Sequence, residues 1–235
     1  MDKLIEWITQ NQDQIGMFFL GLISIGGLIF LVGYYSKKAV VIRTLQKFPK
    51  TAISSLQENQ LVKVMGKAKP IKEVLNAPLS GRKCVYYSVK VEQKSGGRNQ
   101  HWVTIIDDEI APNFLIESYS GKALIKMKNF KSYFIEDAIY KSGHFNDATN
   151  KLEHYLEVHG KKSISFLGLN KTLRYKEAVI EVGEKIAVMG TVKYENISPY
   201  GLTDSYSKIP VLQSIAKNKL IISDDPKALI EKTVS

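Results

Sequence analysis

Cysteine is almost absent from this chain: Cys84 is the only one in 235 residues. An intrachain disulfide is therefore impossible, which suits a reducing compartment, and a zinc module built on several thiolates is excluded. The closest pair of histidines, His154 and His159, is five residues apart, a spacing that does not share one helical face. The sequence therefore predicts neither a metal site nor a cofactor.

Recognisable catalytic signatures are also missing. The sequence has no phosphate-binding glycine loop, no Gly-x-Ser-x-Gly turn and no His-Glu-x-x-His helix. Cys84 starts an alternating strand pattern, in which a thiol usually packs as a small apolar group. We predict no catalytic residue, and a membrane-tethered hydrolase without a familiar motif stays open as an alternative.

Charged residues are lacking throughout Ile15–Tyr35, a run of 21 positions. A bilayer core about 30 Å thick needs ~20 apolar residues in a helix, so the run predicts one transmembrane helix. A secretory signal peptide would have a basic start, a shorter apolar core and a small-residue cleavage site. Here the segment before the run is acidic, and no such cleavage site follows it.

Acidic residues are scarce after the run. Residues 1–14 carry three acids against one lysine, whereas residues 36–72 carry nine lysines and arginines against one glutamate. Positive flanks stay in the cytoplasm, so we expect the N-terminus outside and the main domain cytoplasmic, at a bacterial inner membrane. Anionic lipid would attract the first basic side chains after the run. These are Lys37, Lys38, Arg43, Lys47 and Lys50.

The charge distribution also bears on nucleic acid. Of the net charge of +10, the segment 36–72 holds +8 and the first 14 residues hold −2, which leaves +4 for residues 73–235. A basic nucleic-acid surface is therefore not expected on the main domain. The lysines that follow the run could equally serve only to set the topology.

Beyond residue 60 the apolar pattern changes to strand alternation. Period-2 segments separated by turn residues follow one another over residues 61–125 and 173–223. A helical pattern falls near residues 147–158, with Asn146 as a candidate cap. This order predicts a mainly β (α+β) fold, a small barrel or sandwich with a short helical insertion, tethered by one N-terminal helix. The predicted parts are a head at 1–14, a transmembrane helix at 15–35, a basic connector at 36–59 and a β domain at 60–235 with the insertion at about 130–163.

Glycines and aromatic residues supply the remaining structural candidates. The segment Val64–Lys69 is echoed by Val188–Lys193, with Gly66 and Gly190 at the same place in each. Glycine inside a strand marks a bend or a close backbone approach, and Gly121 follows a turn. Three aromatic side chains, Tyr86, Tyr87 and Trp102, are candidates for a groove, although at strand spacing they are more often core.

Several short segments, in this order, resemble the GIDE or beside-a-membrane domain, over roughly residues 60–233. They are Val64–Ala68, Ala77–Gly81, Cys84–Tyr87, Phe114–Glu117, Ser120–Ala123, Glu177, Val182–Lys185, Val188–Gly190 and Ile221–Ser223. The family includes the mitochondrial ubiquitin ligase MULAN and many bacterial membrane proteins. The family pattern often has an aspartate before the turn glycine, whereas this chain has Ser118 or Tyr119 there.

The resemblance implies a domain beside a membrane helix and, by family label, a RING-type E3 ubiquitin transferase. One cysteine cannot build a RING, which needs several thiolate and imidazole ligands around two zinc ions. We therefore expect a membrane-anchored binding or scaffolding module that holds a protein partner, a second copy or a lipid headgroup at the membrane surface. A ligase-like enzyme remains the alternative that the resemblance raises.

Overall fold

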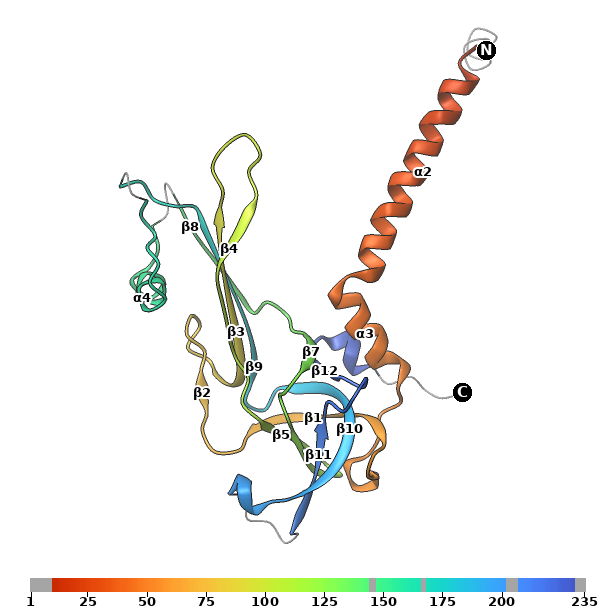
Figure 1. The fold of residues 1–235 in the computed structure, drawn as a ribbon, viewed down its shortest axis with the longest axis vertical. Helices are drawn as coiled ribbons and strands as arrows, with labels where there is room; N and C mark the ends of the chain where they lie inside the picture. Colours follow the sequence, from red (N-terminus) through yellow and green to blue (C-terminus); the bar gives the residue numbers. More distant parts are fainter. Residues whose placement is uncertain (1–9, 144–146, 166–167, 202–206, 231–235) are drawn as a thin grey trace.

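The structure is a computed structural model that describes residues 10–143, 147–165, 168–201 and 207–230. Within these ranges the fold is mainly β, which confirms the expected class. Figure 1 shows one long helix, α2, that projects from a body of two sheets. One sheet closes into a five-stranded barrel, and the other is a half-barrel.

The barrel is formed by strands that are far apart in the sequence. Its strands in spatial order are β1 (Leu61–Pro70), β5 (Phe114–Ser118), β6 (Gly121–Ile125), β11 (Lys208–Gln213) and β10 (Lys185–Asn196). The ring closes because β10 also pairs with β1. Two further strands extend the sheet beyond β10, namely β12 (Leu220–Ser223) and β7 (Phe130–Tyr133).

Strand β1 shows why an alternating sequence is buried here on both faces. Val62 and Val64 belong to the cluster that fills the barrel, whereas Leu61 and Met65 belong to a second cluster on the outside. Successive side chains of a strand point to opposite faces, so the outer face needs its own cover. Helix α3 (Lys37–Lys47) provides it.

Helix α3 is thus part of the folded body. Val41 and Leu45 pack with Met65, Met189 and Ile221 on the outer face of the sheet. The short helix η3 (Pro226–Leu229) lies beside α3, and the Gln46 side-chain amide donates to the carbonyl of Lys227 at 3.0 Å. The structure therefore differs from the expected connector at 36–59: much of it is a helix whose apolar face covers the barrel. A second short helix, η1 (Ile53–Ser55), follows it.

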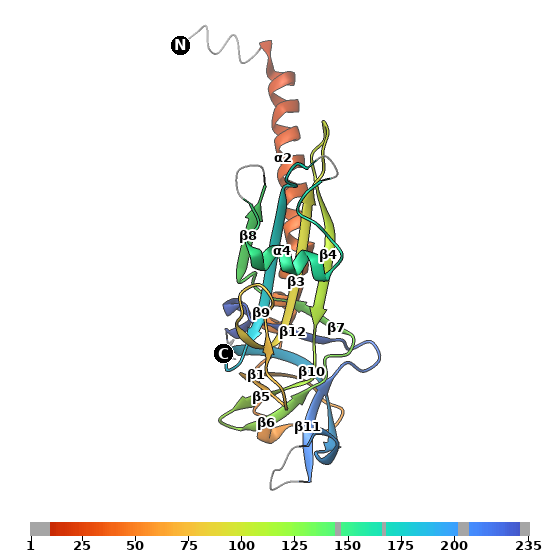
Figure 2. The ribbon, with the colours of Figure 1, turned by 90° about the vertical axis from the view of Figure 1, so that its left-hand side faces the viewer.

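The half-barrel sheet carries the helical insertion. Its strands are β2 (Leu75–Asn76), β3 (Lys83–Lys94), β9 (Leu173–Glu181) and β8 (Ala138–Ser142), with β4 (Trp102–Ile110) paired to β3. Figure 2 shows α4 (Asn150–Val158) lying across this sheet. Leu152, Tyr155 and Leu156 are buried against it, as their helical spacing predicts.

The helix of the insertion is shorter than expected. Residues 130–142 form β7 and β8, so only Asn150–Val158 of the interval 130–163 is α-helical. The side chain of Thr149 caps this helix by accepting from the amide of Leu152 at 3.4 Å. Asn146, the expected cap, lies outside the described residues.

Helix α2 (Gln12–Tyr35) includes the continuous helix expected over Ile15–Tyr35. It ends at Ser36, whose hydroxyl donates to the carbonyl of Gly33 and accepts from the amide of Ala39, so that one residue stops α2 and caps α3. In the described part of the chain, no helix alone has the length and hydropathy of a membrane span. Leu20–Tyr35 and Lys37–Lys47 reach that criterion only together, with a bend of 60° between them. The expected head at 1–14 lies mostly outside the described residues.

Candidate functional site

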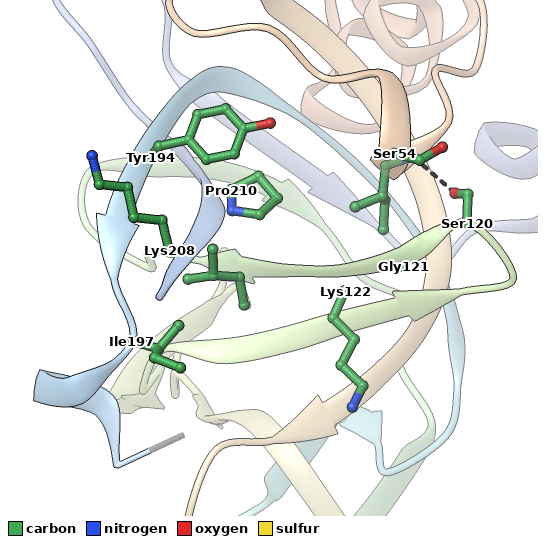
Figure 3. A pocket seen from close by; sticks show the side chains of 10 residues that line it. Ser54, Ser120, Gly121, Lys122, Tyr194, Ile197, Lys208 and Pro210 are labelled. Atoms are coloured by element: carbon green, nitrogen blue, oxygen red, sulfur yellow. Dashed lines mark hydrogen bonds between the residues drawn. The ribbon is translucent and has the colours of Figure 1, made fainter. Parts of the chain in front are cut away.

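Within the barrel, β6 and β11 share fewer paired residues than any other two neighbouring strands. These two strands run parallel and pair only through Val211 with Leu124 and Leu212 with Ile125. The residues before these pairs, Gly121–Ala123 on β6 and Lys208–Pro210 on β11, pair with β5 and β10 on their other sides. The two stretches share no ladder pair with each other, and we call them the β6–β11 seam. A cavity of about 570 Å³ lies at the seam (Figure 3).

The lining of this cavity combines apolar, hydroxyl and basic groups. Its ten residues are Ile53, Ser54, Ser120, Gly121, Lys122, Tyr194, Ile197, Lys208, Ile209 and Pro210. A cavity of this size falls in the ~300–1,000 Å³ range of ligand sites. The lining includes two lysines and, among the described residues, no carboxylate. The Lys122 ammonium lies 3.8 Å from the carboxylate of Glu117 on the neighbouring strand.

Hydrogen bonds hold the rim of the cavity in place. The amide of Ile53 in η1 donates to the hydroxyl of Ser120 at 2.8 Å (Figure 3). That hydroxyl also lies 2.9 Å from the hydroxyl of Ser118. Gly121 has a φ of +130°, which a residue with a side chain rarely adopts, so the tight β5–β6 turn requires glycine there. Across the cavity, the Tyr194 hydroxyl donates to the carbonyl of Leu56 at 3.0 Å.

The three aromatic residues expected to share a groove lie apart. Tyr86 is buried, its ring packs 4.5 Å from that of Phe134, and its hydroxyl donates to Glu109 at 2.7 Å. Burial, with Glu109 next to the hydroxyl, raises the pKa of Tyr86. Tyr87 packs against the opposite face of the sheet, in the clusters that include Tyr155 and Cys84. Trp102 stacks under the Arg174 guanidinium at 4.3 Å.

Tyr86 instead lines a polar cleft of about 500 Å³ between α3, β7 and the half-barrel sheet. Four of its six charged side chains form two ion pairs with one another. The Lys90 ammonium lies 3.5 Å from Asp107, and the Lys176 ammonium lies 2.9 Å from Glu136. Because these pairs neutralise each other locally, the cleft offers a bound ion little net attraction.

The basic residues expected at a membrane surface have different surroundings. Lys37 and Lys47 are exposed. Lys38 pairs with the buried Asp225 at 3.2 Å and lies 4.7 Å from the centre of the Tyr133 ring. Hydrogen bonding to the Tyr133 side chain, and then to Asp225, raises the pKa of Lys38. Arg43 lies over the Tyr34 ring, and Lys50 lies 5.5 Å from the Tyr119 ring.

Cys84 is enclosed at the start of β3. Burial, and then the negative charge of Glu177, raise the pKa of the Cys84 thiol to about 11. The thiol is therefore protonated near neutral pH, whereas reactive cysteines are exposed and have a lowered pKa. Glu177 itself is buried, and its two carboxylate oxygens accept from the amides of Leu79 and Ser80 at 2.7 and 2.8 Å. It holds the loop over the sheet.

Within the described ranges, no group of three or more histidine, cysteine or acidic side chains is arranged to hold a metal ion.

No family model, curated protein or solved structure matches this chain. We therefore take the cavity at the seam as the candidate site, on the basis of its geometry alone. The sequence analysis did not predict it, because Lys122, Lys208 and Pro210 become neighbours only through the β6–β11 pairing. Pro210 within an apolar segment was the one local signal of a sheet edge.

Proposed function

We propose that this chain is a membrane-anchored binding module. Helix α2 inserts into a bilayer, and the β body lies on the cytoplasmic side, where it holds a protein partner at the membrane surface. This is the arrangement that the GIDE resemblance implies for residues 60–233. The barrel would be the recognition unit, and α3, packed on the barrel, would connect that unit to the anchor through Ser36.

The exposed apolar surface of α2 carries the proposal. Every residue from Leu20 to Tyr35 is exposed, and Ile23 and Phe30 have about 70% of their surface open (71% and 69%). Leaving such side chains in water costs roughly 25 cal/mol per Å². Large contiguous apolar surfaces mark contact with a membrane or with a protein partner. A helix apolar on all sides, next to a basic segment, favours the membrane.

The joint between α2 and α3 has the residues of a membrane interface. Tyr34 and Tyr35 end α2, and aromatic residues of this kind gather where hydrocarbon meets water. The Arg43 guanidinium lies 3.6 Å from the centre of the Tyr34 ring and donates to the Tyr34 carbonyl at 2.6 Å. Lys37 and Lys47 remain exposed nearby for anionic lipid.

The half-barrel sheet sets a condition on insertion. The β3–β4 hairpin reaches the level of the middle of α2 in both views (Figures 1 and 2). Its loop, residues 95–101, is polar and includes the exposed Arg98. A polar loop cannot share the hydrocarbon layer with α2 without a large cost. We therefore propose that α2 turns about Ser36 on insertion, away from the hairpin.

Membrane extraction tests the anchor. The tagged full chain should stay in the membrane pellet after an alkaline wash and leave it only with detergent. Leu28→Arg places a charge where it costs ~2.5–3.5 kcal/mol in a bilayer, so it should release part of the protein. Ile139→Arg, at another exposed apolar position, is the matched control and should remain in the pellet.

Two outcomes would overturn the proposal. Release of the unmodified chain by alkali as an oligomer would mean that further copies, and not lipid, cover α2. Digestion of the β body by protease added to sealed right-side-out vesicles would place that body on the outer side.

A further inference from the structure

We infer that the polar cleft between α3, β7 and the half-barrel sheet binds a phospholipid headgroup that carries both a phosphate and a primary ammonium group, as phosphatidylethanolamine does. The inference rests on the proposed function, because the lipid would come from the bilayer that holds α2. Three observations carry it: the two charged side chains that the cleft leaves without an ion pair, its balance of charge and its place at the foot of α2.

Two charged side chains of the cleft have no ion-pair partner among the described residues. They are Lys37, at the start of α3, and Glu109, on β4. The four other charged side chains are engaged in the two ion pairs described above. Because Lys37 and Glu109 belong to different walls of the cleft, a ligand seated there would meet one cation and one anion.

The carboxylate of Glu109 is held by a neighbouring hydroxyl. The buried Tyr86 donates to its Oε1 at 2.7 Å, and the Tyr86 ring packs 4.5 Å from that of Phe134. A carboxylate fixed in this way can accept from an ammonium group, and charge-assisted hydrogen bonds are about twice as strong as neutral ones. The trimethylated ammonium of choline has no hydrogen to donate. The site should therefore distinguish ethanolamine from choline.

The balance of charge favours a zwitterion. The cleft is lined by three lysines and three carboxylates, so its net charge is zero. A simple anion or cation gains little there, whereas a zwitterion can place each of its charges beside an opposite one. The phosphate would lie near the Lys37 ammonium and the ligand's ammonium near Glu109. The cleft volume, about 500 Å³, falls in the ~300–1,000 Å³ range of small-ligand sites.

The cleft lies where the anchor would leave the bilayer. Lys37 follows Ser36, the residue at which α2 ends. Figure 1 places α3 and β7 at the foot of α2, and Lys38 of α3 lies 4.7 Å from the Tyr133 ring of β7. None of the described lining residues belongs to α2, so the cleft persists when α2 turns about Ser36. A headgroup can therefore enter it while its acyl chains stay in the bilayer.

Native mass spectrometry of the detergent-solubilised full chain tests the inference. The chain is titrated with dioleoyl phosphatidylethanolamine and, separately, with dioleoyl phosphatidylcholine, so that only the headgroup differs. Lipid that coats α2 through its acyl chains should bind equally in both titrations. We expect one further phosphatidylethanolamine per chain, bound at least about tenfold more tightly than phosphatidylcholine, because choline cannot donate to Glu109.

Two matched pairs of variants locate the site. Glu109→Gln keeps an acceptor for Tyr86 but removes the negative charge, and it should reduce the preference for phosphatidylethanolamine to less than about threefold. Glu73→Gln, at an exposed carboxylate, should keep the preference. Lys37→Gln should weaken phosphatidylethanolamine binding at least about fivefold, whereas Lys47→Gln, at the other end of α3, should leave it unchanged. Circular dichroism checks that all four variants are folded.

Soluble phosphoethanolamine separates the two sources of the same headgroup. As a competitor it should bind at least about a hundredfold more weakly than the lipid, because acyl chains in the micelle hold the lipid headgroup beside the cleft at a high effective concentration. Equal affinities would assign the cleft to a soluble ligand and overturn the lipid inference.

The inference is also overturned if the two lipids bind alike, or if Glu109→Gln and Lys37→Gln behave as their control variants do. Membrane extraction measures α2 and does not depend on Glu109. A chain that stays in the membrane pellet without a headgroup preference contradicts only the cleft, whereas a chain that alkali releases contradicts the anchor.

Discussion

Val64 and Val188 lie directly opposite each other in the antiparallel β1–β10 pair. They are the first residues of the two similar segments, which therefore lie in the pair of strands that closes the barrel. The antiparallel arrangement places each glycine of the echo two residues from this central pair, in opposite directions. Gly66 faces Ile186, and Gly190 faces Val62. The local similarity therefore has a structural counterpart at the point of closure.

Substitution of these glycines should destabilise the barrel unequally. A Cβ at Gly66 would collide with the backbone carbonyl of Glu117, whereas one at Gly190 would meet a terminal methyl of Leu220 at 2.8 Å and the Gln213 backbone less closely, at 3.3 Å. Backbone cannot yield easily, but a leucine methyl can. We expect Gly66→Ala to lower the free energy of unfolding by more than ~1 kcal/mol, and Gly190→Ala by less. Urea denaturation measures both, and Gly96→Ala, in open space, is the control; equal losses at Gly66 and Gly96 would contradict the prediction.

Removal of α3 should expose the outer face of the barrel. A fragment that starts at residue 60 lacks Val41 and Leu45, which cover Met65 and Met189. We expect this fragment to aggregate, and a fragment from residue 37 to be soluble and to unfold cooperatively. In the full chain, Leu45→Ala should cost ~2–5 kcal/mol, because Leu45 is fully buried, whereas Lys47→Ala on the exposed side should change little. A soluble, cooperative fragment from residue 60 would show that α3 is dispensable.

Stability should fall as the pH rises through the titration of Asp224. Its carboxylate is buried, and both oxygens accept from the amide of Ile135 at 3.1 and 3.2 Å. Burial, together with the charges of Glu184 and Asp137, raises the pKa of Asp224 from 3.8 to about 7. The folded state therefore binds the proton more tightly than the unfolded state. This stabilisation is complete below about pH 4 and is lost as the pH rises to about 7.

Asp224→Asn should remove much of this dependence. The amide oxygen can still accept from Ile135, and no buried charge forms. We expect the variant to be more stable than the parent at pH 8 by at least ~1 kcal/mol, with a flatter stability profile between pH 5 and 8. Thermal unfolding across this pH range measures both quantities. Glu73→Gln, at an exposed carboxylate, is the control, and an identical pH slope in parent and Asp224→Asn would refute the assignment.

Insertion of α2 should separate it from the β3–β4 hairpin in depth. A spin label at Ile25→Cys should be accessible to oxygen dissolved in the bilayer, and one at Asn99→Cys to a water-soluble nickel chelate. The native Cys84 is buried, with a pKa of about 11, so it should react slowly with the labelling reagent. Both labels in the same phase would show that α2 does not turn about Ser36 in the way proposed.

Sequence alone predicted the elements that depend on local pattern. The uncharged run predicted the helix that is part of α2, and alternation predicted strands such as β1, β3 and β10, because side-chain direction repeats every two residues in a strand. The fold class followed from the number and spacing of these strands. The spacing of Leu152, Tyr155 and Leu156 likewise predicted the buried face of α4.

Tertiary structure decided which segments became neighbours. The closure of β1 on β10, the short strand β11 around Pro210 and the parallel pairing of β7 with β12 join residues far apart in the chain. Their pairing depends on how the whole core packs, which no local window contains. For the same reason the sequence of α3 predicts only a basic connector, since the partners of its apolar face lie on strands far along the chain. The β6–β11 seam likewise depends on two distant strands that pair over only two residues each, and the packing of the whole barrel sets that short overlap.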